Sequence, residues 1–265
     1  MRFAFQPTRF EGPWLESSLI DLATGGWLDE VLFRVSNGKE ATVYCCRASE
    51  WTDLDLLAAN VYRPRRQRAM RNYHTYRQAN QVQARDRRLQ RALARGTRKG
   101  IEAQDAEWVR SEHPKLVDLH ELGAGVPRSL DCGPTAVLTE YIGDAEGAAP
   151  RLSDVAVASE QLQTLFERLL DNIGLFLARG VVHADLSAYN VLMWQGDPFI
   201  IDFPQAMDPA VSSQAFAMLV RDVERSTEYC VRQGAVVDPE TGAAADGTQI
   251  ARRLWDRCAE PGWLG

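Results

Sequence analysis

Two short apolar stretches that carry acidic and amide side chains are the most constraining feature of this 265-residue sequence. The first, VVHADLSAYNVL at 181–192, contains Asp185 and Asn190 five residues apart. The second, FIIDFPQ, places Asp202 directly after an apolar run, and a Gln-Gly-Asp turn lies between the two stretches. Apolar runs bounded by turn residues are typical of short buried strands. We therefore expect a hairpin, with these three polar side chains converging beside it.

This set of side chains suits phosphoryl transfer, which needs an oriented acceptor hydroxyl and a divalent metal against the phosphates. We assign the first task to Asp185. Carboxylate and amide oxygens are ligands that Mg²⁺ accepts, so Asn190 and Asp202 are the predicted metal ligands. The alternative is that Asp185 and Asn190 only cap a turn, but the acid that follows the next strand favours a catalytic site. His183 is expected to brace the loop by hydrogen bonding and not to act as the base.

The rest of the sequence predicts a sheet-rich region followed by a helical region, which is an α+β fold. Turn signals and alternating apolar residues predict two strands within 27–49, around a turn at Asn37-Gly38, and further strands at 54–63, 126–131 and 136–142. Apolar residues at a 3.6-residue period predict helices at 14–24, 106–123, 159–180, 212–233 and 248–259. Pro114 is expected to bend or break the second of these helices.

Three segments follow from this order of elements: an N-terminal helical extension at 1–26, an N-lobe at 27–143 and a C-lobe at 144–265. The boundary is a Gly/Pro/Ala-rich connector at 143–154. The N-lobe contains a basic insert, 63–99, with twelve Arg and one Lys against a single acid, whereas the whole chain has a formal charge of −6. Pockets form preferentially between domains, so the nucleotide site is expected between the lobes.

The stretch SNGKEATVY, at 36–44, is a candidate phosphate cradle. Backbone N–H groups of Ser36 and Gly38, in a turn between two strands, can bind phosphate oxygens. An ordinary hairpin turn explains the same residues equally well when the stretch is taken alone. The cradle is favoured only because of the acidic cluster further along the chain.

Four motifs occur in order along the chain: GKEATVY, EYIGDAEGAAPRL, VVHADLSAYNVL and IIDFPQ. Together they resemble the RIO family of atypical serine/threonine protein kinases, and the resemblance extends over roughly 27–235. It implies a bilobal protein-kinase-like fold with a small antiparallel-sheet N-lobe and a mainly helical C-lobe. It also implies the absence of the usual activation loop, and ATP with Mg²⁺ as the nucleotide.

The resemblance also implies roles for individual residues. Asp185 matches the catalytic-loop aspartate and Asn190 its metal-binding partner. Asp202 matches the metal-binding aspartate, a carboxylate that is thought to become transiently phosphorylated in some members. The implied nucleotide-binding residues lie in the phosphate loop, a strand, a helix, the hinge and the connector: Ser36, Gly38, Lys39, Glu40, Asn60, Glu112, Glu140, Tyr141, Ile142 and Pro150.

One position departs from the family pattern. The strand lysine that normally binds the α and β phosphates is replaced by Asn60, so Glu112, its expected partner, loses a cation. A charge-assisted hydrogen bond contributes ~1.5–3 kcal/mol against ~1 kcal/mol for a neutral one, so activity could be impaired. Arg63 lies three residues further along the strand and should face the opposite side. Lys39, in the phosphate loop, is the better candidate for a partial replacement.

Three functions stay open. The first is a RIO-type protein kinase or ATPase with an unknown protein substrate, and the second is a nucleotide-binding pseudokinase that acts as a scaffold. The third is a small-molecule phosphotransferase of the aminoglycoside or choline kinase type, which GKEATVY and GDAEGAAPRL disfavour. Because the family is linked to ribosome assembly, the insert 63–99 is a candidate contact for RNA or a ribosomal partner, with steeply salt-dependent binding.

The sequence predicts a cytoplasmic protein that does not enter a membrane. No apolar run approaches the ~20 residues that span a bilayer, and the first residues lack the apolar core of a secretory signal. The five cysteines are odd in number and form no C-x-x-C motif, so we expect free thiols in a reducing compartment.

Overall fold

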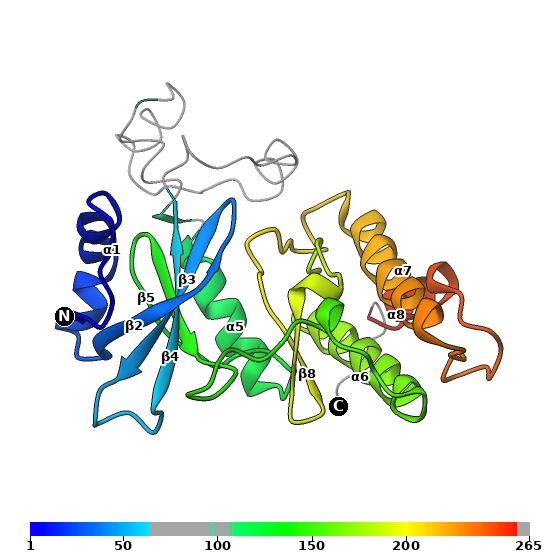
Figure 1. Ribbon diagram of the computed structural model, residues 1–265. Helices are drawn as coiled ribbons and strands as arrows, with labels where there is room; N and C mark the ends of the chain where they lie inside the picture. The colour runs from blue at the N-terminus through cyan, green and yellow to red at the C-terminus, as the bar shows by residue number, and fades with distance from the viewer. Residues whose placement is uncertain (64–96, 98–105, 108, 259–265) are drawn as a thin grey trace. The chain divides into compact units, whose positions relative to one another are not determined.

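A six-stranded sheet and a set of helices with one hairpin form two separate units in the computed structural model (Figure 1). The structure describes residues 1–63, 97, 106, 107 and 109–258. Of these, residues 118–126 and 149–258 make up the second unit, and the rest belong to the first. The chain is thus α+β, with a mainly β part before a mainly helical part, as the sequence predicts.

The sheet of the first unit has the strand order β1-β2-β3-β4-β6-β5. Its strands are β1 (Arg2–Phe3), β2 (Leu28–Asn37), β3 (Ala41–Ala48), β4 (Leu56–Tyr62), β5 (Ser129–Cys132) and β6 (Ala136–Glu140). The pairs from β2 onward are antiparallel and confirm the predicted hairpins. Strand β1 pairs parallel to β2 and was not predicted, because two residues carry no readable pattern.

Helix α1 (Glu11–Thr24) packs against one face of this sheet (Figure 1). Leu15, Leu19 and Leu22 are fully buried, at the i, i+4, i+7 spacing of one helical face. They contact Tyr44 and other apolar side chains that the strands direct to the same side. The helix therefore closes the core of the first unit and is not a loose extension.

Helix α5 (Glu112–Glu121) starts later than the sequence predicts. The predicted helix 106–123 is interrupted by a turn at Ser111, and Pro114 becomes the third residue of α5. A proline is tolerated in the first helical turn because its missing N–H would have no intrahelical partner there. The predicted stop is confirmed, since Gly123 adopts φ +85° and its N–H donates to the carbonyl of His120.

The second unit contains α6 (Ser159–Ala178), α7 (Ala215–Gln233), α8 (Gly247–Cys258) and the hairpin of β7 (Val191–Trp194) and β8 (Asp197–Ile200). Helix α7 packs against both α6 and α8. Two short 3-10 helices, η2 (Leu152–Asp154) and η3 (Ala188–Asn190), precede α6 and β7. The three α-helices and the two strands of the hairpin correspond to elements that the sequence predicts in this region.

A close backbone approach ties residues 118–126 to this hairpin. The carbonyl of Gly125 accepts the N–H of Ile200 at 2.7 Å, and its N–H donates to the Oδ1 of Asn172 on α6. A Cβ at position 125 would lie 2.5 Å from the carbonyl oxygen of Pro198. Only glycine fits there, so β8 is anchored to α6 through this position.

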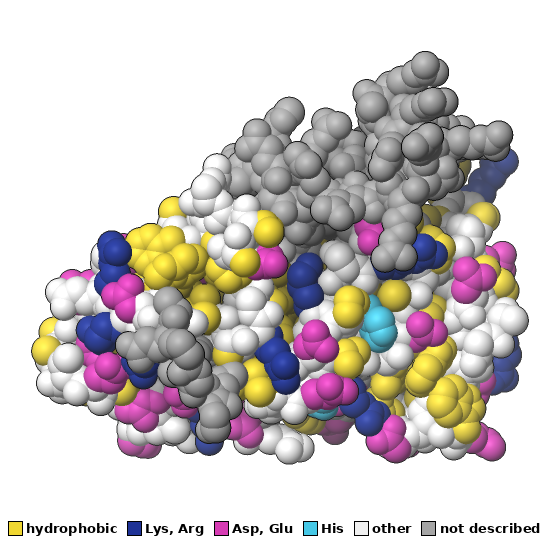
Figure 2. All heavy atoms as spheres, turned by 180° about the vertical axis from the view of Figure 1, so that it is seen from behind, with side chains coloured by type: hydrophobic (Ala, Val, Ile, Leu, Met, Phe, Trp, Pro, Cys, Tyr) yellow, Lys and Arg dark blue, Asp and Glu magenta, His cyan; other side chains and the backbone are white. Residues whose placement is uncertain are grey.

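Charge is mixed on the described surface. On the face shown in Figure 2, Lys and Arg side chains alternate with Asp and Glu side chains and with apolar ones. The strongly basic part of the sequence, 63–99, lies outside the described residues apart from Arg63 and Thr97. Across the described ranges, no helix combines the length and apolar character needed to cross a membrane.

The packing of α1 predicts a clear contrast between two adjacent side chains. Leu19 is fully buried, whereas Ile20 is 49% exposed. Leu19→Ala should lower the free energy of unfolding by about 3 kcal/mol, because it leaves a cavity in the core. Ile20→Ala should change it by less than about 0.5 kcal/mol. Urea denaturation measures both, and equal effects would show that α1 does not pack as described.

Candidate active site

The β7–β8 hairpin places Asn190 beside Asp202. Val191 and Ile200 are paired across the two strands, and the N–H of Ile201 donates to the carbonyl of Asn190 at 2.9 Å. The two predicted metal ligands, Asn190 and Asp202, thus lie just beyond the last residue pair of the β7–β8 hairpin. This is the arrangement that the sequence predicts from an apolar strand ending in an acid.

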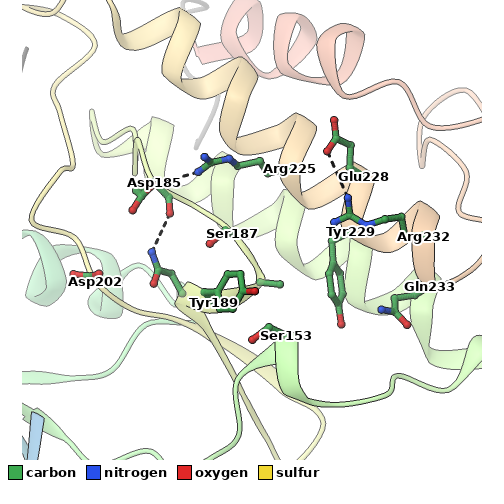
Figure 3. A pocket seen from close by; sticks show the side chains of 12 residues that line it. Ser153, Asp185, Ser187, Tyr189, Asp202, Arg225, Glu228, Tyr229, Arg232 and Gln233 are labelled. Carbon is green, nitrogen blue, oxygen red and sulfur yellow. Dashed lines mark hydrogen bonds and ion pairs between the residues drawn. The ribbon is translucent and has the colours of Figure 1, made fainter. Parts of the chain in front are cut away.

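A side-chain hydrogen bond brings Asp185 to the same place. The Nδ2 of Asn190 donates to the carbonyl oxygen of Asp185 at 3.0 Å, and the N–H of Asn190 donates to Ser187. Asp185, Asn190 and Asp202 all line one pocket of about 630 Å³ in the second unit (Figure 3). The three residues thus line the same pocket, and their catalytic and metal-binding roles stay predictions.

Two residues of this site have a left-handed backbone. Ala184 has φ 67° and Asp202 has φ 72°, a region that non-glycine residues rarely occupy. Such conformations persist only where the surrounding structure holds them in place, and they cluster at active sites. Ala184 directly precedes the predicted catalytic residue Asp185, and Asp202 is itself a predicted catalytic residue.

The carboxylate of Asp222, on α7, holds the first of these conformations. Its Oδ2 accepts the N–H of Ala184 at 2.6 Å, and its Oδ1 accepts the N–H of Leu186 at 2.9 Å. These N–H groups flank Asp185 on both sides. Asp222 is 1% exposed, and burial raises its pKa to about 7, while the two N–H bonds and the nearby Arg221 favour its charged form. Asp222 is a positioning residue for the loop.

Sequence reasoning missed Asp222, although a signal was present. Leu219, Asp222, Val223 and Ser226 share the buried face of α7. An acid at helical spacing among buried residues must be paired or hydrogen-bonded, since burying an unpaired charge is costly. The acid could therefore have been marked as structural or functional, but its partners could not be named.

His183 braces the loop, as expected. Its Nε2 lies 3.1 Å from the carbonyl oxygen of Ile201, and its Nδ1 is 3.3 Å from the N–H of Asp185. The ring also packs against Phe203, which in turn packs against Phe176 of α6. His183 binds the N–H of Asp185, and Phe203 directly follows Asp202, so the packing of these two rings helps to hold both Asp185 and Asp202 in place. Burial lowers the pKa of His183 to about 4, so the ring is neutral near pH 7.

Two arginines of α7 contact the carboxylate of Asp185. Arg221 Nη2 lies 3.1 Å from Oδ1. Arg225 Nη1 lies 3.2 Å from the same oxygen (Figure 3). Arg221 also donates to the carbonyl of Ala184 at 3.0 Å. The other carboxylate oxygen, Oδ2, lies 3.5 Å from the Nε2 of Gln205. Since Oδ1 is held by two cations, Oδ2 is the oxygen suited to orient an acceptor hydroxyl.

The donor set at this site fits Mg²⁺. The Nδ2 of Asn190 donates to the carbonyl of Asp185, so its Oδ1 is the atom suited to bind a cation. Asp202, which lines the same pocket, can supply a carboxylate. Within the described part of the chain, no three His, Cys, Asp or Glu side chains gather into a metal cluster. One carboxylate and one amide fit Mg²⁺, which usually keeps waters and phosphate oxygens as its other ligands.

The predicted phosphate-loop residues belong to the first unit, in the β2–β3 hairpin. Ser36 is in β2, Gly38 donates its N–H to the carbonyl of Ala41 at 2.9 Å, and Lys39 is exposed. The carbonyl of Glu40 accepts the N–H of Arg63 at 2.8 Å. The turn is an ordinary hairpin stabilised by β4, so a phosphate role for it stays a prediction.

The side chain of Arg63 binds residues of the β2–β3 hairpin. Its guanidinium donates to the side chains of Asn37 and Thr42, the latter at 3.0 Å. Thr42 follows the hairpin turn and is 1% exposed. The expectation that Arg63 points away from the missing lysine's position agrees with these contacts.

Hydrogen bonds connect the side chain of Asn60 to that of Glu112 through Tyr62. The Nδ2 of Asn60 donates to the hydroxyl of Tyr62 at 3.0 Å, and that hydroxyl donates to the Oε2 of Glu112 at 2.5 Å. Glu112 is 4% exposed, and the Oδ1 of Asn60 is buried without a hydrogen-bond partner. The tyrosine hydroxyl therefore links the side chains of Asn60 and Glu112.

The predicted hinge lies at the end of β6. Glu140 donates its N–H to the carbonyl of Arg128 and accepts the N–H of Arg128 through its Oε1. Tyr141 and Ile142 are 9% and 7% exposed. Pro150 belongs to the second unit, where its carbonyl accepts the N–H of Met193 at 2.8 Å. The roles of these four residues toward a nucleotide stay predictions.

A family model for the RIO domain matches residues 48–241, more than half of the chain. The chain belongs to the RIO family. A RIO-type serine/threonine-protein kinase Rio1 from Haloferax volcanii is 28% identical over 225 residues, covering 85% of this chain and 71% of the relative. A Rio1 from Thermoplasma acidophilum is 29% identical over 133 residues, covering 50% and 68%. The serine/threonine-protein kinase RIO1 of Chaetomium thermophilum is 25% identical, covering 82% and 42%.

Family membership makes the chain one of a group of phosphotransferases with a kinase-like fold, which confirms the expected family and fold class. Within the RIO family match lie Asn60, Glu112, Asp185, Asn190 and Asp202. The resemblance read from four short motifs is therefore correct. That Asn60 stands where relatives carry the strand lysine stays a prediction from the sequence.

Buried, neutral His183 predicts a loss of stability in mild acid. The unfolded imidazole takes up a proton below about pH 6.5, whereas the folded one resists it down to about pH 4. The contribution of His183 is thus complete above pH 6.5 and is lost as the pH falls. Urea unfolding at pH 6.5 and pH 5 should show about 2 kcal/mol lost, and less in His183→Gln. A wild type and a variant with equal pH dependence would contradict this assignment.

Proposed function

We propose that this chain is a Mg²⁺- and ATP-dependent RIO-type serine/threonine protein kinase or ATPase. The observation that carries the proposal is the convergence of Asp185, Asn190 and Asp202 on one pocket. Family membership supports the kind of chemistry, because the relatives are named serine/threonine-protein kinases. We also propose a cytoplasmic location, and the five free cysteines agree with a reducing compartment.

The proposed chemistry is transfer of the γ-phosphoryl group to a hydroxyl. The hydroxyl oxygen forms a bond to the γ-phosphorus, the bond to the β–γ bridging oxygen breaks, and the hydroxyl proton leaves. Asp185 Oδ2 would orient that hydroxyl and take up its proton. Asn190 and Asp202 would hold the metal, which neutralises charge on the phosphates when bound. Arg221 and Asp222 keep Asp185 in place.

The proposed nucleotide-binding residues of the first unit lie in the β2–β3 turn, in β4 (Asn60), in α5 (Glu112) and at the end of β6. Pro150, in the second unit, is also proposed to bind the nucleotide. We propose that backbone groups of Glu140, Tyr141 and Ile142 contact the adenine. Ser36, Gly38 and Lys39 would contact the phosphates. Glu40 would complete this loop. Lys39 is exposed on the β2–β3 turn, so its ammonium is accessible to an anion.

A second candidate is a nucleotide-binding pseudokinase that acts as a scaffold. The hydrogen-bonded chain Asn60–Tyr62–Glu112 favours it, because no charge-assisted contact to phosphate comes from this strand position. An RNA or ribosomal partner for the insert 63–99 stays a prediction from the sequence, since that segment lies outside the described residues.

Two substitutions in the second unit separate binding from turnover. Asp202→Asn should weaken Mg-ATP binding by about tenfold or more, since it removes the carboxylate ligand. Asp185→Asn should keep binding but lower turnover by about 10²-fold or more. Calorimetry with ATP and Mg²⁺, followed by a phosphate-release assay, measures both. Glu160→Gln, an exposed acid outside the pocket, is the matched control. If both variants bound Mg-ATP and turned it over as the wild type does, the proposal would be refuted.

Restoring the lysine distinguishes an impaired kinase from a scaffold. Asn60→Lys should raise turnover by about tenfold or more if phosphate contact limits the reaction, because it adds a charge-assisted bond. Lys39→Ala should lower Mg-ATP affinity about fivefold if the loop supplies a replacement cation. Turnover absent in both wild type and Asn60→Lys, with nucleotide still bound, would favour the scaffold. Unchanged affinity in Lys39→Ala would remove Lys39 from the site.

A further inference from the structure

One face of α7 extends the pocket beyond the three catalytic positions. Arg225, Glu228, Tyr229, Arg232 and Gln233 line it at i, i+3, i+4, i+7 and i+8, which is a single helical stripe (Figure 3). We call these five residues the α7 stripe. The stripe begins at Asp185, through the ion pair of Arg225, and continues away from it along the helix.

The opposite side of this extension is fixed to the stripe. The hydroxyl of Tyr229 donates to the carbonyl of Leu152 at 2.7 Å, and both residues are at least 90% buried. Ser153, the next residue of η2, lines the pocket opposite α7 (Figure 3). A buried hydrogen bond between the two walls keeps their spacing, so the extension is a built part of the fold.

The arginines of the stripe retain binding capacity. Arg225 pairs with Asp185 through Nη1 alone, and Asp185 Oδ1 is also held by Arg221. A guanidinium carries five N–H donors, so Arg225 can bind a second carboxylate. Arg232 meets Glu228 at 3.8 Å with both side chains 68% exposed, a pair that contributes little and is easily replaced.

We propose that the α7 stripe is the acceptor site and selects an acidic protein segment. This inference rests on the proposed kinase function. The segment places a serine or threonine hydroxyl at Asp185 and carboxylates at Arg225 and Arg232. Arg–carboxylate pairing can be bidentate, which gives geometric selectivity as well as attraction. Within the stripe, two arginines stand against one glutamate, and the other acids of the pocket, Asp185 and Asp202, belong to the proposed catalytic end.

Helix geometry sets the spacing of the acidic residues. Seven residues separate Arg225 from Arg232, so their Cα atoms are about 10 Å apart along α7. An extended segment rises about 3.3 Å per residue, so about three residues cover the same length. The preferred substrate therefore carries two acidic residues about three positions apart, on one side of the phosphorylated hydroxyl.

Matched synthetic peptides test this proposal on the whole chain. Each contains one serine, and the two spaced positions are Asp, Asn or Lys, placed before or after the serine. Phosphate transfer from labelled ATP gives KM and kcat, and fluorescence anisotropy with the same peptides gives affinity without turnover. The wild type should favour the Asp peptide by about fivefold or more in KM, the order of one or two partly exposed ion pairs. Raising the salt concentration should reduce this preference.

Variants of the stripe should change peptide preference. Arg232→Glu, which does not touch Asp185, should lose the Asp preference and gain affinity for the Lys peptide. Arg225→Gln should lose part of the preference as well. Arg179→Gln removes an exposed arginine outside the pocket and should keep it.

The outcomes separate the acceptor site from the kinase function. Transfer to peptides with equal KM for Asp, Asn and Lys would overturn the acceptor proposal and leave the kinase function standing. Charge-dependent binding without any transfer would support the site and contradict the kinase function. Absence of both binding and transfer would overturn the acceptor site, while Mg-ATP turnover measured alongside still decides the ATPase.

Discussion

The site depends on one buried carboxylate. Asp222 accepts the backbone N–H groups on either side of Asp185, and no water-exposed residue could hold that loop in the same way. The left-handed conformation at Ala184 turns the chain between these two hydrogen bonds. Losing the carboxylate would leave two buried donors unpaired, each at a cost of about 1–3 kcal/mol. The conformation of the catalytic loop therefore depends on hydrogen bonds to α7 as well as on the residues of the loop itself.

A second anchor comes from α6. Phe176 packs edge-on against Phe203, and Phe203 packs against the ring of His183. This apolar stack lies directly after Asp202, so the metal-binding end of the hairpin is attached to a long buried helix. Functional groups held by packed helices keep their geometry better than groups on free loops. The two acids are thus positioned from two different helices within the same unit.

Local signals in the sequence were sufficient for the hairpin and for its three polar side chains. The apolar runs and the Gln-Gly-Asp turn predict β7 and β8, and Asn190 and Asp202 lie just outside the paired ends of these strands. Asp185 lies instead in the loop before η3, because the first apolar run becomes a strand only from Val191.

The partners of Asp185 could not be predicted, because Arg221 and Arg225 lie 36 and 40 residues away along the chain. Their approach depends on how α7 packs, and an amphipathic pattern specifies a face without specifying a neighbour. Pro114 shows the same limit, since the pattern predicted a bend or break, and the structure interrupts the helix at Ser111, with Pro114 in the first turn of α5.

The hydrogen-bonded chain from Asn60 through Tyr62 to Glu112 has a consequence for how such a chain is screened. Because the tyrosine hydroxyl donates to the buried glutamate, that carboxylate is hydrogen-bonded without a lysine at position 60. Melting temperature and expression yield report on this hydrogen-bonded chain and not on any contact with phosphate, so a variant library sorted on either one is not sorted for catalysis. Sorting for catalysis requires a readout of chemistry.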